Sequence, residues 1–506
     1  MYYPRRITLF LLVIIVITVT MTATAQEAPV KILAWIGNGV APGEQSPDQP
    51  GQIVYLTGNE QFEVLFDLPP NTTRVMPCSE QATSPDGRYF AFFAGGDTGS
   101  LYWVDGANTP VEIDTDVNAL ACLGMGTFQY SPDGSRFGYI DYTTPLQSSY
   151  AAGWFYVLDA ATQTPIFASD STVGGDNNVA AFDISNDAIA FVSLYLDADA
   201  DVKEAAIFYQ AGTYPVEIST LYADENCDFR SLEIAIIDAN TLALVVAQHC
   251  ENTEWALYRV NITQRSANRT LVTGNVAGGY YAVARSNVAV VAPDGNTLYL
   301  ASPNGLERNI ADIQAVNLTD IQTGAPLLTY AVMPLYNGYT SSGNAWPGLS
   351  PDGNWWAVIT NTADGDAAVN AVELGAPDLP PITVPAPARG NTISALAFTP
   401  NSSALLFVAG GNNTEDNSLF ALDLVAAAES RVMRGRFGAQ IVVAPDGQYA
   451  ALPNWRVVNA PNQPSYLTLI AINLQTGEPI SVFTGAEVVN DVVSNQRFVY
   501  PLSWRG

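Results

Sequence analysis

A short phrase, Ser/Ala-Pro-Asp-Gly followed directly by an apolar run, returns about every fifty residues along this chain. It stands at 84–87, 131–134, 292–295, 350–353 and 444–447, with a degenerate copy at 399–402. Proline fixes φ, aspartate hydrogen-bonds the backbone ahead of it, and glycine tolerates positive φ, so the phrase predicts a tight turn. Its recurrence at a steady period predicts one small unit stacked many times, because a single unit cannot bury its own apolar face.

The residues after each turn have the composition of β-strands. Aromatic and β-branched residues follow the turns directly, as at 88–93 and 355–359, and a second such run comes within about fifteen residues, as at 101–105 and 419–423. A shorter and more polar third run follows, and the run before each turn, such as 393–398, supplies a fourth. No window of comparable length has a period of 3.6 residues, so we expect very little helix.

Two weaker turns fill the gap between 134 and 292, at 184–187 and 237–240. With them the chain holds eight four-stranded units, which predict an all-β fold: a single β-propeller of eight antiparallel blades, with seven as the alternative. Strand-like runs also lie near both ends of the chain, at 32–36 and 497–500. We expect strands from both termini to share one sheet and close the ring, because that leaves no exposed edge.

The Ser-Pro-Asp-Gly turns with their apolar strands, together with the Thr-Gly turn at 473–477, resemble the WD40-like repeats of the TolB-type propeller family. The resemblance covers most of the chain and implies a propeller, but the motif implies no particular activity. TolB proteins carry an α/β domain ahead of a six-bladed propeller, whereas here strand-like runs begin near residue 32. Prolyl oligopeptidases use similar repeats beside a hydrolase domain, yet this chain has no Gly-x-Ser-x-Gly nucleophile motif.

The N-terminus has the pattern of a secretory signal. Two arginines at 5–6 precede an apolar run at 9–17, and small residues follow at 23–25. We therefore expect a signal peptide at 1–25 and a mature propeller domain at 26–506, located outside the cell or in the periplasm or cell envelope. An uncleaved anchor is the alternative, although the apolar stretch falls short of the roughly 20 residues that span a bilayer. No later run is long enough to insert the mature chain into a membrane.

The charge of the chain excludes some partners. Its 49 acidic and 20 basic residues give a formal net charge of -29. Such a surface repels phosphate backbones and anionic lipids, so we expect no nucleic-acid partner. The acidity is typical of a soluble exported protein, and it says nothing about the oligomeric state.

Four cysteines in an exported chain predict disulfides, because the compartment is oxidising. Cys78 and Cys122 lie 44 residues apart, close to one repeat, so they occupy similar places in neighbouring units. Cys227 and Cys250 fall in two loops that the repeat alignment puts on one face. We predict the pairs Cys78–Cys122 and Cys227–Cys250, with four buried reduced thiols as the alternative.

Residues that could carry chemistry are few. The one histidine, His249, has no nucleophile motif beside it, so we expect no catalytic triad, no zinc site and no cofactor. Asp197, Asp199 and Asp201 have the alternating carboxylates of calcium loops, but no glycine follows them and Phe208 stands where a bidentate glutamate is needed. A solvated hairpin tip is the favoured interpretation, and calcium the weaker one.

These observations favour an exported, non-enzymatic propeller that recognises a protein, peptide or glycan. Signals for the fold are abundant and signals for catalysis are absent, although a fold by itself never specifies a function. The alternative is a carboxylate-dependent glycan hydrolase or lyase with its site in the central pocket, since 49 acids are available and none is singled out.

Overall fold

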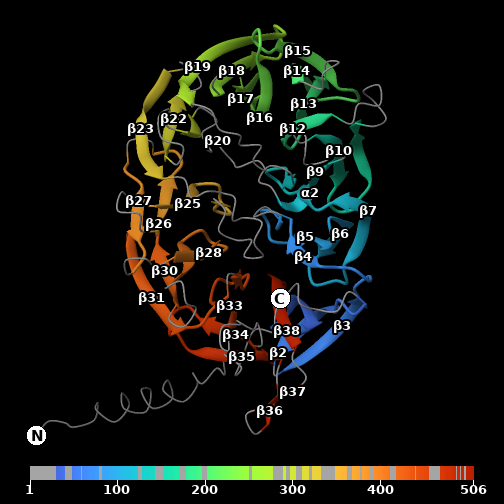
Figure 1. The fold of residues 1–506 in the computed structure, drawn as a ribbon, viewed down its shortest axis with the longest axis vertical. Helices are drawn as coiled ribbons and strands as arrows, with labels where there is room; N and C mark the ends of the chain where they lie inside the picture. The colour runs from blue at the N-terminus through green and yellow to red at the C-terminus, as the bar shows by residue number, and fades with distance from the viewer. Residues whose placement is uncertain are drawn as a thin grey trace, which may run out of the picture.

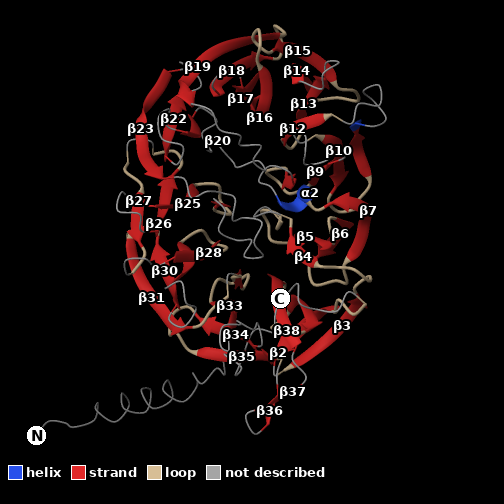
Figure 2. Ribbon diagram, in the orientation of Figure 1, coloured by secondary structure: helices blue, strands red, loops and turns tan. Residues whose placement is uncertain are grey.

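The computed structural model of this protein is built almost entirely of antiparallel β-strands. It describes residues 30–39, 48–58, 60–78, 82–123, 128–142, 152–169, 178–196, 202–249, 253–276, 289–291, 297–303, 310–317, 322–331, 348–361, 367–376, 379–387, 392–410, 417–438, 440–454, 468–485, 487–489, 492–494 and 497–506. Helix in this part of the chain is confined to α2 (Leu120–Leu123), a single turn, and to Ser169 (Figure 2). No helix among these residues is long and apolar enough to span a bilayer. The predicted signal peptide at 1–25 lies outside the described residues.

The strands form sets of four, in which each strand pairs antiparallel with the next. The first five sets contain β1 (Ile32–Asn38), β2 (Gln52–Gly58), β3 (Gln61–Asp67) and β38 (Arg497–Trp504); β4 (Arg74–Pro77), β5 (Tyr89–Gly95), β6 (Thr98–Asp105) and β7 (Val111–Asn118); β8 (Phe128–Tyr130), β9 (Arg136–Tyr142), β10 (Gly153–Asp159) and β11 (Pro165–Ala168); β12 (Val179–Ile184), β13 (Ile189–Leu196), β14 (Val202–Gln210) and β15 (Val216–Tyr222); β16 (Asp228–Asp238), β17 (Thr241–His249), β18 (Thr253–Asn261) and β19 (Ser266–Val276).

The remaining sets follow the same pattern. They contain β20 (Ala289–Val291), β21 (Thr297–Pro303), β22 (Ile310–Asn317) and β23 (Gln322–Ala331); β24 (Gly348–Leu349), β25 (Trp355–Asn361), β26 (Ala367–Glu373) and β27 (Ile382–Pro385); β28 (Thr392–Phe398), β29 (Ala404–Gly410), β30 (Asn417–Asp423) and β31 (Ala428–Gly435); β32 (Val442–Val443), β33 (Tyr449–Asn454), β34 (Thr468–Asn473) and β35 (Pro479–Thr484). A separate hairpin, β36 (Glu487–Val489) and β37 (Val492–Ser494), lies between β35 and β38 and projects from the edge of the molecule (Figure 1).

These sets succeed one another around a ring, in chain order from blue to red (Figure 1). Two neighbouring pairs of sets are each joined by a single residue pair, Gly153 with Val179 and Ala331 with Asn361. Sequential four-stranded antiparallel sheets around one axis are the architecture of a β-propeller, in which each set is a blade. The predicted all-β class with very little helix is therefore confirmed for the described residues.

The described strands make nine sets of four, one more than the eight units expected from the turns. The reason lies in the set that contains both ends of the chain. In the other sets the repeated turn joins the first strand to the second, but here these strands are β38 and β1, at opposite ends of the sequence. No turn can connect them, so the eight repeated turns account for the other eight sets, and the sheet expected to join the two termini is a ninth set instead of part of the eight.

Both chain ends are held by contacts beyond the strand ladder. The backbone N–H of Arg505 donates to the carbonyl of Lys31 at 2.7 Å. The Arg505 guanidinium, almost fully buried, donates to the carbonyls of Gly106 at 2.7 Å and of Arg88 in the neighbouring blade. Burial lowers the pKa of Arg505, and the nearby Tyr55 and other acidic groups oppose that shift.

The repeated turns have the geometry that their residues predict. At 84–87 the Ser84 hydroxyl donates to the Asp86 carboxylate at 2.6 Å and accepts from the backbone N–H of Tyr89 at 2.8 Å. The same carboxylate accepts from the backbone N–H of Arg88 at 3.0 Å. The Asp352 turn repeats this pattern: burial opposes ionisation there, but hydrogen bonds from Ser350 and its neighbours leave the pKa of Asp352 lowered. These aspartates are structural.

Glycine is required at the fourth turn position by its backbone conformation. Gly87 has φ of 73°, and a Cβ built on it meets no atom within 4 Å. We expect Gly87→Ala to lower the free energy of unfolding by about 1 kcal/mol, entirely through backbone strain. Gly212→Ala is the matched control, since that site is equally open and has no positive φ. Chemical denaturation of both variants checks this, and equal effects would contradict it.

Apolar side chains fill the spaces between blades. Trp103 of β6 stacks on Phe137 of β9 with ring centroids 4.1 Å apart, and Phe155 of β10 stacks on Phe182 of β12 at 4.4 Å. Each contact joins two successive blades. Burial of both faces of a blade explains why the strands after the turns are rich in aromatic residues instead of strictly alternating.

Candidate binding face and inner collar

The two faces of the ring differ in the length of their connections. On one, here called the turn face, lie the repeated turns and the links between the third and fourth strands, such as 160–164 and 211–215. On the other, the loop face, the links between strand ends vary in length and several are long, among them 39–51, 143–152 and 455–467. Long segments grouped at one end of a rigid scaffold are where binding residues usually lie.

The predicted calcium residues and Cys250 fall in links between strands whose described ends lie at the loop face. Asp197, Asp199 and Asp201 connect β13 to β14, and Cys250 follows β17, but all four lie outside the described residues. His249 ends β17, where its backbone pairs with that of Asp228. Calcium binding at the three aspartates is therefore untested. Among the described residues, no group of three or more His, Cys, Asp and Glu side chains is arranged to hold a metal ion.

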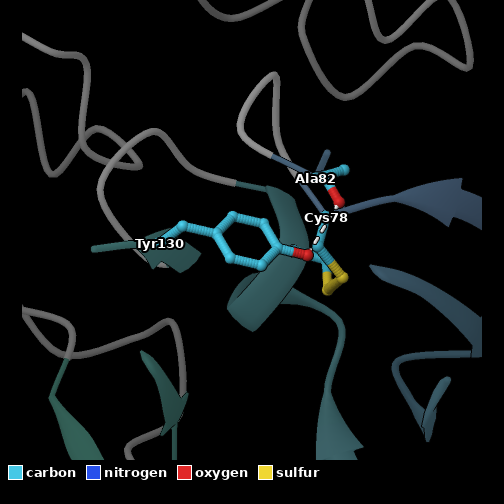
Figure 3. The surroundings of a disulfide bond; sticks show 4 residues. Cys78, Ala82 and Tyr130 are labelled. Atoms are coloured by element: carbon cyan, nitrogen blue, oxygen red, sulfur yellow. Dashed lines mark hydrogen bonds between the residues drawn. A yellow bond between two sulfur atoms is a disulfide. The ribbon is translucent and has the colours of Figure 1, made fainter. Parts of the chain in front are cut away.

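The structure contains a disulfide between Cys78 and Cys122, as the spacing predicts. It joins the chain just after inner strand β4 to helix α2 in the link toward the next blade, and both sulfur-bearing residues are buried. Figure 3 shows Tyr130 of β8 beside this bond, with its hydroxyl donating to the carbonyl of Ala82 at 3.3 Å. The disulfide therefore ties the second and third blades together near the inner edge of the ring.

The second predicted pair is tested only in part by the strand register. Asp228 and His249 lie directly opposite each other in β16 and β17. They adjoin Cys227 and Cys250 along the chain, and Cys227 is buried. Cys227 is disulfide-bonded, and the register is compatible with Cys250 as its partner; that pairing stays a prediction.

A set of polar contacts joins the innermost strands of three blades. The Asp183 carboxylate of β12 accepts from Gln129 of β8 at 3.3 Å and from the backbone N–H groups of Ile184 at 2.9 Å and Ile236 of β16 at 2.6 Å. Gln129 also donates to the carbonyl of Phe182 at 3.1 Å. We call these residues the inner collar. The Asp183 carboxylate thus accepts from the backbone N–H of Ile236, which lies on the inner edge strand β16 and faces the ring interior.

Sequence reasoning did not single out Asp183, because nothing local distinguishes it from the other acids. Burial raises the pKa of Asp183, although the hydrogen bonds from Ile236, Ile184 and Gln129 oppose the shift. A raised pKa is typical of a general acid in glycan cleavage, but such enzymes need a second carboxylate beside the first. The causes of this shift are burial and hydrogen bonds, with no charged group of the described residues among them.

The raised pKa predicts a pH-dependent stability. A folded-state pKa above the unfolded value of 3.8 makes the Asp183 contribution most favourable at low pH, and it is lost as pH rises through the folded pKa. We expect the melting temperature of Asp183→Asn, relative to the parent, to rise as pH increases from about 4 to neutrality.

The asparagine amide has one acceptor oxygen where the carboxylate has two, and this loss changes the melting temperature by the same amount at every pH. The quantity to measure is therefore how the difference in melting temperature between variant and parent changes with pH. Thermal melts between pH 3.5 and 7 check it, and a difference that is independent of pH would contradict the expectation. Asp446→Asn, in an exposed repeated turn, is the control for carboxylate removal elsewhere.

Comparison with known proteins adds little to this description. No family model matches the chain, and no curated protein matches it. Solved structures that resemble it include a eukaryotic initiation factor (10% identity, 94% of this chain and 98% of that one, TM-score 0.49), dipeptidyl peptidase 4 of Porphyromonas gingivalis (12%, 81% and 59%, 0.49) and TolB of Acinetobacter baumannii (14%, 73% and 82%, 0.26). At these TM-scores the likenesses carry no functional argument. The fold assignment rests on the strand topology of the chain itself.

Proposed function

We propose that this chain is an exported, non-enzymatic, closed β-propeller of nine blades that recognises a protein, peptide or glycan in the cell envelope or outside the cell. The observation that carries the proposal is the contrast between the two faces. Short turns stabilise one face, and long segments, such as 39–51 and 455–467, link strand ends at the other end of the scaffold. Pairing of β1 with β38 supports the closed ring.

Two features support export. The sequence at 1–25 has the pattern of a signal peptide, and a disulfide joins Cys78 to Cys122. N-terminal sequencing of the protein recovered from outside the expressing cell tests this, and the expected first residue is Gln26. Recovery of the intact N-terminus in the membrane fraction would favour the uncleaved anchor instead.

The binding role is tested with a panel of glycans and peptides. The ligand for this test is a member of the panel that the parent chain binds. We expect replacement of 455–467 or 143–151 by short Gly-Ser linkers to abolish its binding, because both segments link strand ends at the loop face. The matched control replaces the turn-face link 211–214 in the same way and should retain binding. Binding that survives every loop-face replacement would overturn the proposal. Turnover of a glycan on the same panel would support the hydrolase or lyase alternative.

A further inference from the structure

An unusual group of positive charge lies on the outer rim of this acidic protein. The chain has only 20 lysines and arginines among 506 residues, yet Arg431, Arg434 and Arg436 fall within six positions of one another. The first two belong to β31, the outermost strand of its blade, and the third follows its end. Local charge is therefore opposite in sign to the net charge of the molecule.

A β-bulge places two of these arginines on the same side of the sheet. Arg431 pairs with Phe420 and Arg434 with Ser418, but between these pairs Leu419 lies opposite Met433, so Val432 is an extra residue. Phe420 and Ser418 are two apart on β30 and therefore face the same way. Without the bulge, residues three apart would face opposite ways. The two arginine stems thus leave the same side of the strand, about 7 Å apart along it.

That side of the blade faces the preceding one. Phe420 and Leu422 pack with Val369 of β26 and Val384 of β27 in one core cluster. Both Arg431 and Arg434 are exposed above this apolar seam. Glu429 lies opposite Leu422, hence on the same side, and burial raises the pKa of its carboxyl. Two guanidinium groups and one acid therefore line the rim at the seam between β27 and β31.

We propose that this arginine pair is a docking site for an anionic glycan that carries sulfate or carboxylate groups. This proposal rests on the recognition function proposed above. Guanidinium groups bind such anions through paired, charge-assisted hydrogen bonds. An extended peptide would gain most from pairing with the free edge of β31, and the bulge disrupts that ladder. A glycan needs no strand pairing.

The test uses dextran sulfate and alginate as probes, with neutral dextran as the matched polymer. We expect the full chain to bind one or both anionic polymers and not dextran, and Arg431→Gln/Arg434→Gln to weaken that binding at least about tenfold. Glu429→Gln should strengthen it, because it removes a carboxylate from the same side. Arg74→Gln/Arg265→Gln is the control, because it changes the net charge by the same amount at two other exposed arginines. Its affinity for the anionic polymer should stay within about twofold of that of the parent chain.

Each other outcome has a defined meaning. Failure to bind either anionic polymer, an equal effect of the two arginine double variants, or equal arginine-dependent binding of polyglutamate would overturn the assignment. Loss of rim binding in Arg431→Gln/Arg434→Gln with unchanged binding of a loop-face ligand separates this site from the loop face. The proposed function would instead fail if the loop-face replacements left all ligands bound. Circular dichroism of every variant confirms that the fold is intact.

Discussion

Replacement of Phe498 by alanine will lower the free energy of unfolding by about 3–5 kcal/mol, because a large and fully buried side chain leaves a cavity. Phe498 lies in β38 and is 0% exposed. Its ring packs edge-on against that of Trp35 in β1, with the ring centroids 4.8 Å apart. The measurement is chemical denaturation followed by circular dichroism. Val425→Ala, at a side chain that is 91% exposed, is the control and should change stability by less than about 0.5 kcal/mol.

A double-mutant cycle makes this test specific for pairing of the two chain ends. Trp35→Leu and Phe498→Ala should be coupled by about 0.5–1.5 kcal/mol, since each variant alone removes the same ring contact. Additive effects would show that β1 and β38 do not pack together in solution. The closed ring of the proposed function would then lose its support.

Removal of the disulfide in Cys78→Ala/Cys122→Ala will lower the free energy of unfolding by about 4 kcal/mol. The sequence separation is 44 residues, and a closed loop of that size restricts the unfolded chain by about this amount. Each single variant should cost nearly as much as the double variant, because either one breaks the bond. Denaturation under non-reducing conditions measures the effect, and single variants that add up to the double would contradict it.

The predicted pair Cys227–Cys250 gives a related expectation. Mass spectrometry of the non-reduced, protease-digested protein should find two linked peptide pairs and no free thiol. Cys227→Ala/Cys250→Ala should cost about 3 kcal/mol, since its loop is shorter. Detection of a free thiol at Cys227 or Cys250 would leave Cys78–Cys122 as the one disulfide of the chain.

Patterns carried by neighbouring residues were enough to predict the repeated unit. Each turn is stabilised within a few residues, as Ser84, Asp86 and the N–H of Tyr89 show, so its residues predict it directly. The strands after the turns could be predicted for the same reason, because their composition reflects burial on both faces. The Cys78–Cys122 pair followed from its spacing, which is close to one repeat.

Contacts between residues far apart in the chain needed the tertiary structure. The ninth set of strands joins β38 to β1, and no local motif marks a junction between opposite ends of the sequence. The inner collar joins Asp183 to Gln129 and Ile236, each on a different blade. One register shift in β31 decides which way Arg431 and Arg434 point. Local propensity is encoded in adjacent residues. The closure of the ring, the inner collar and the direction of the β31 arginines depend instead on strand register and on packing between blades, which only the assembled sheets determine.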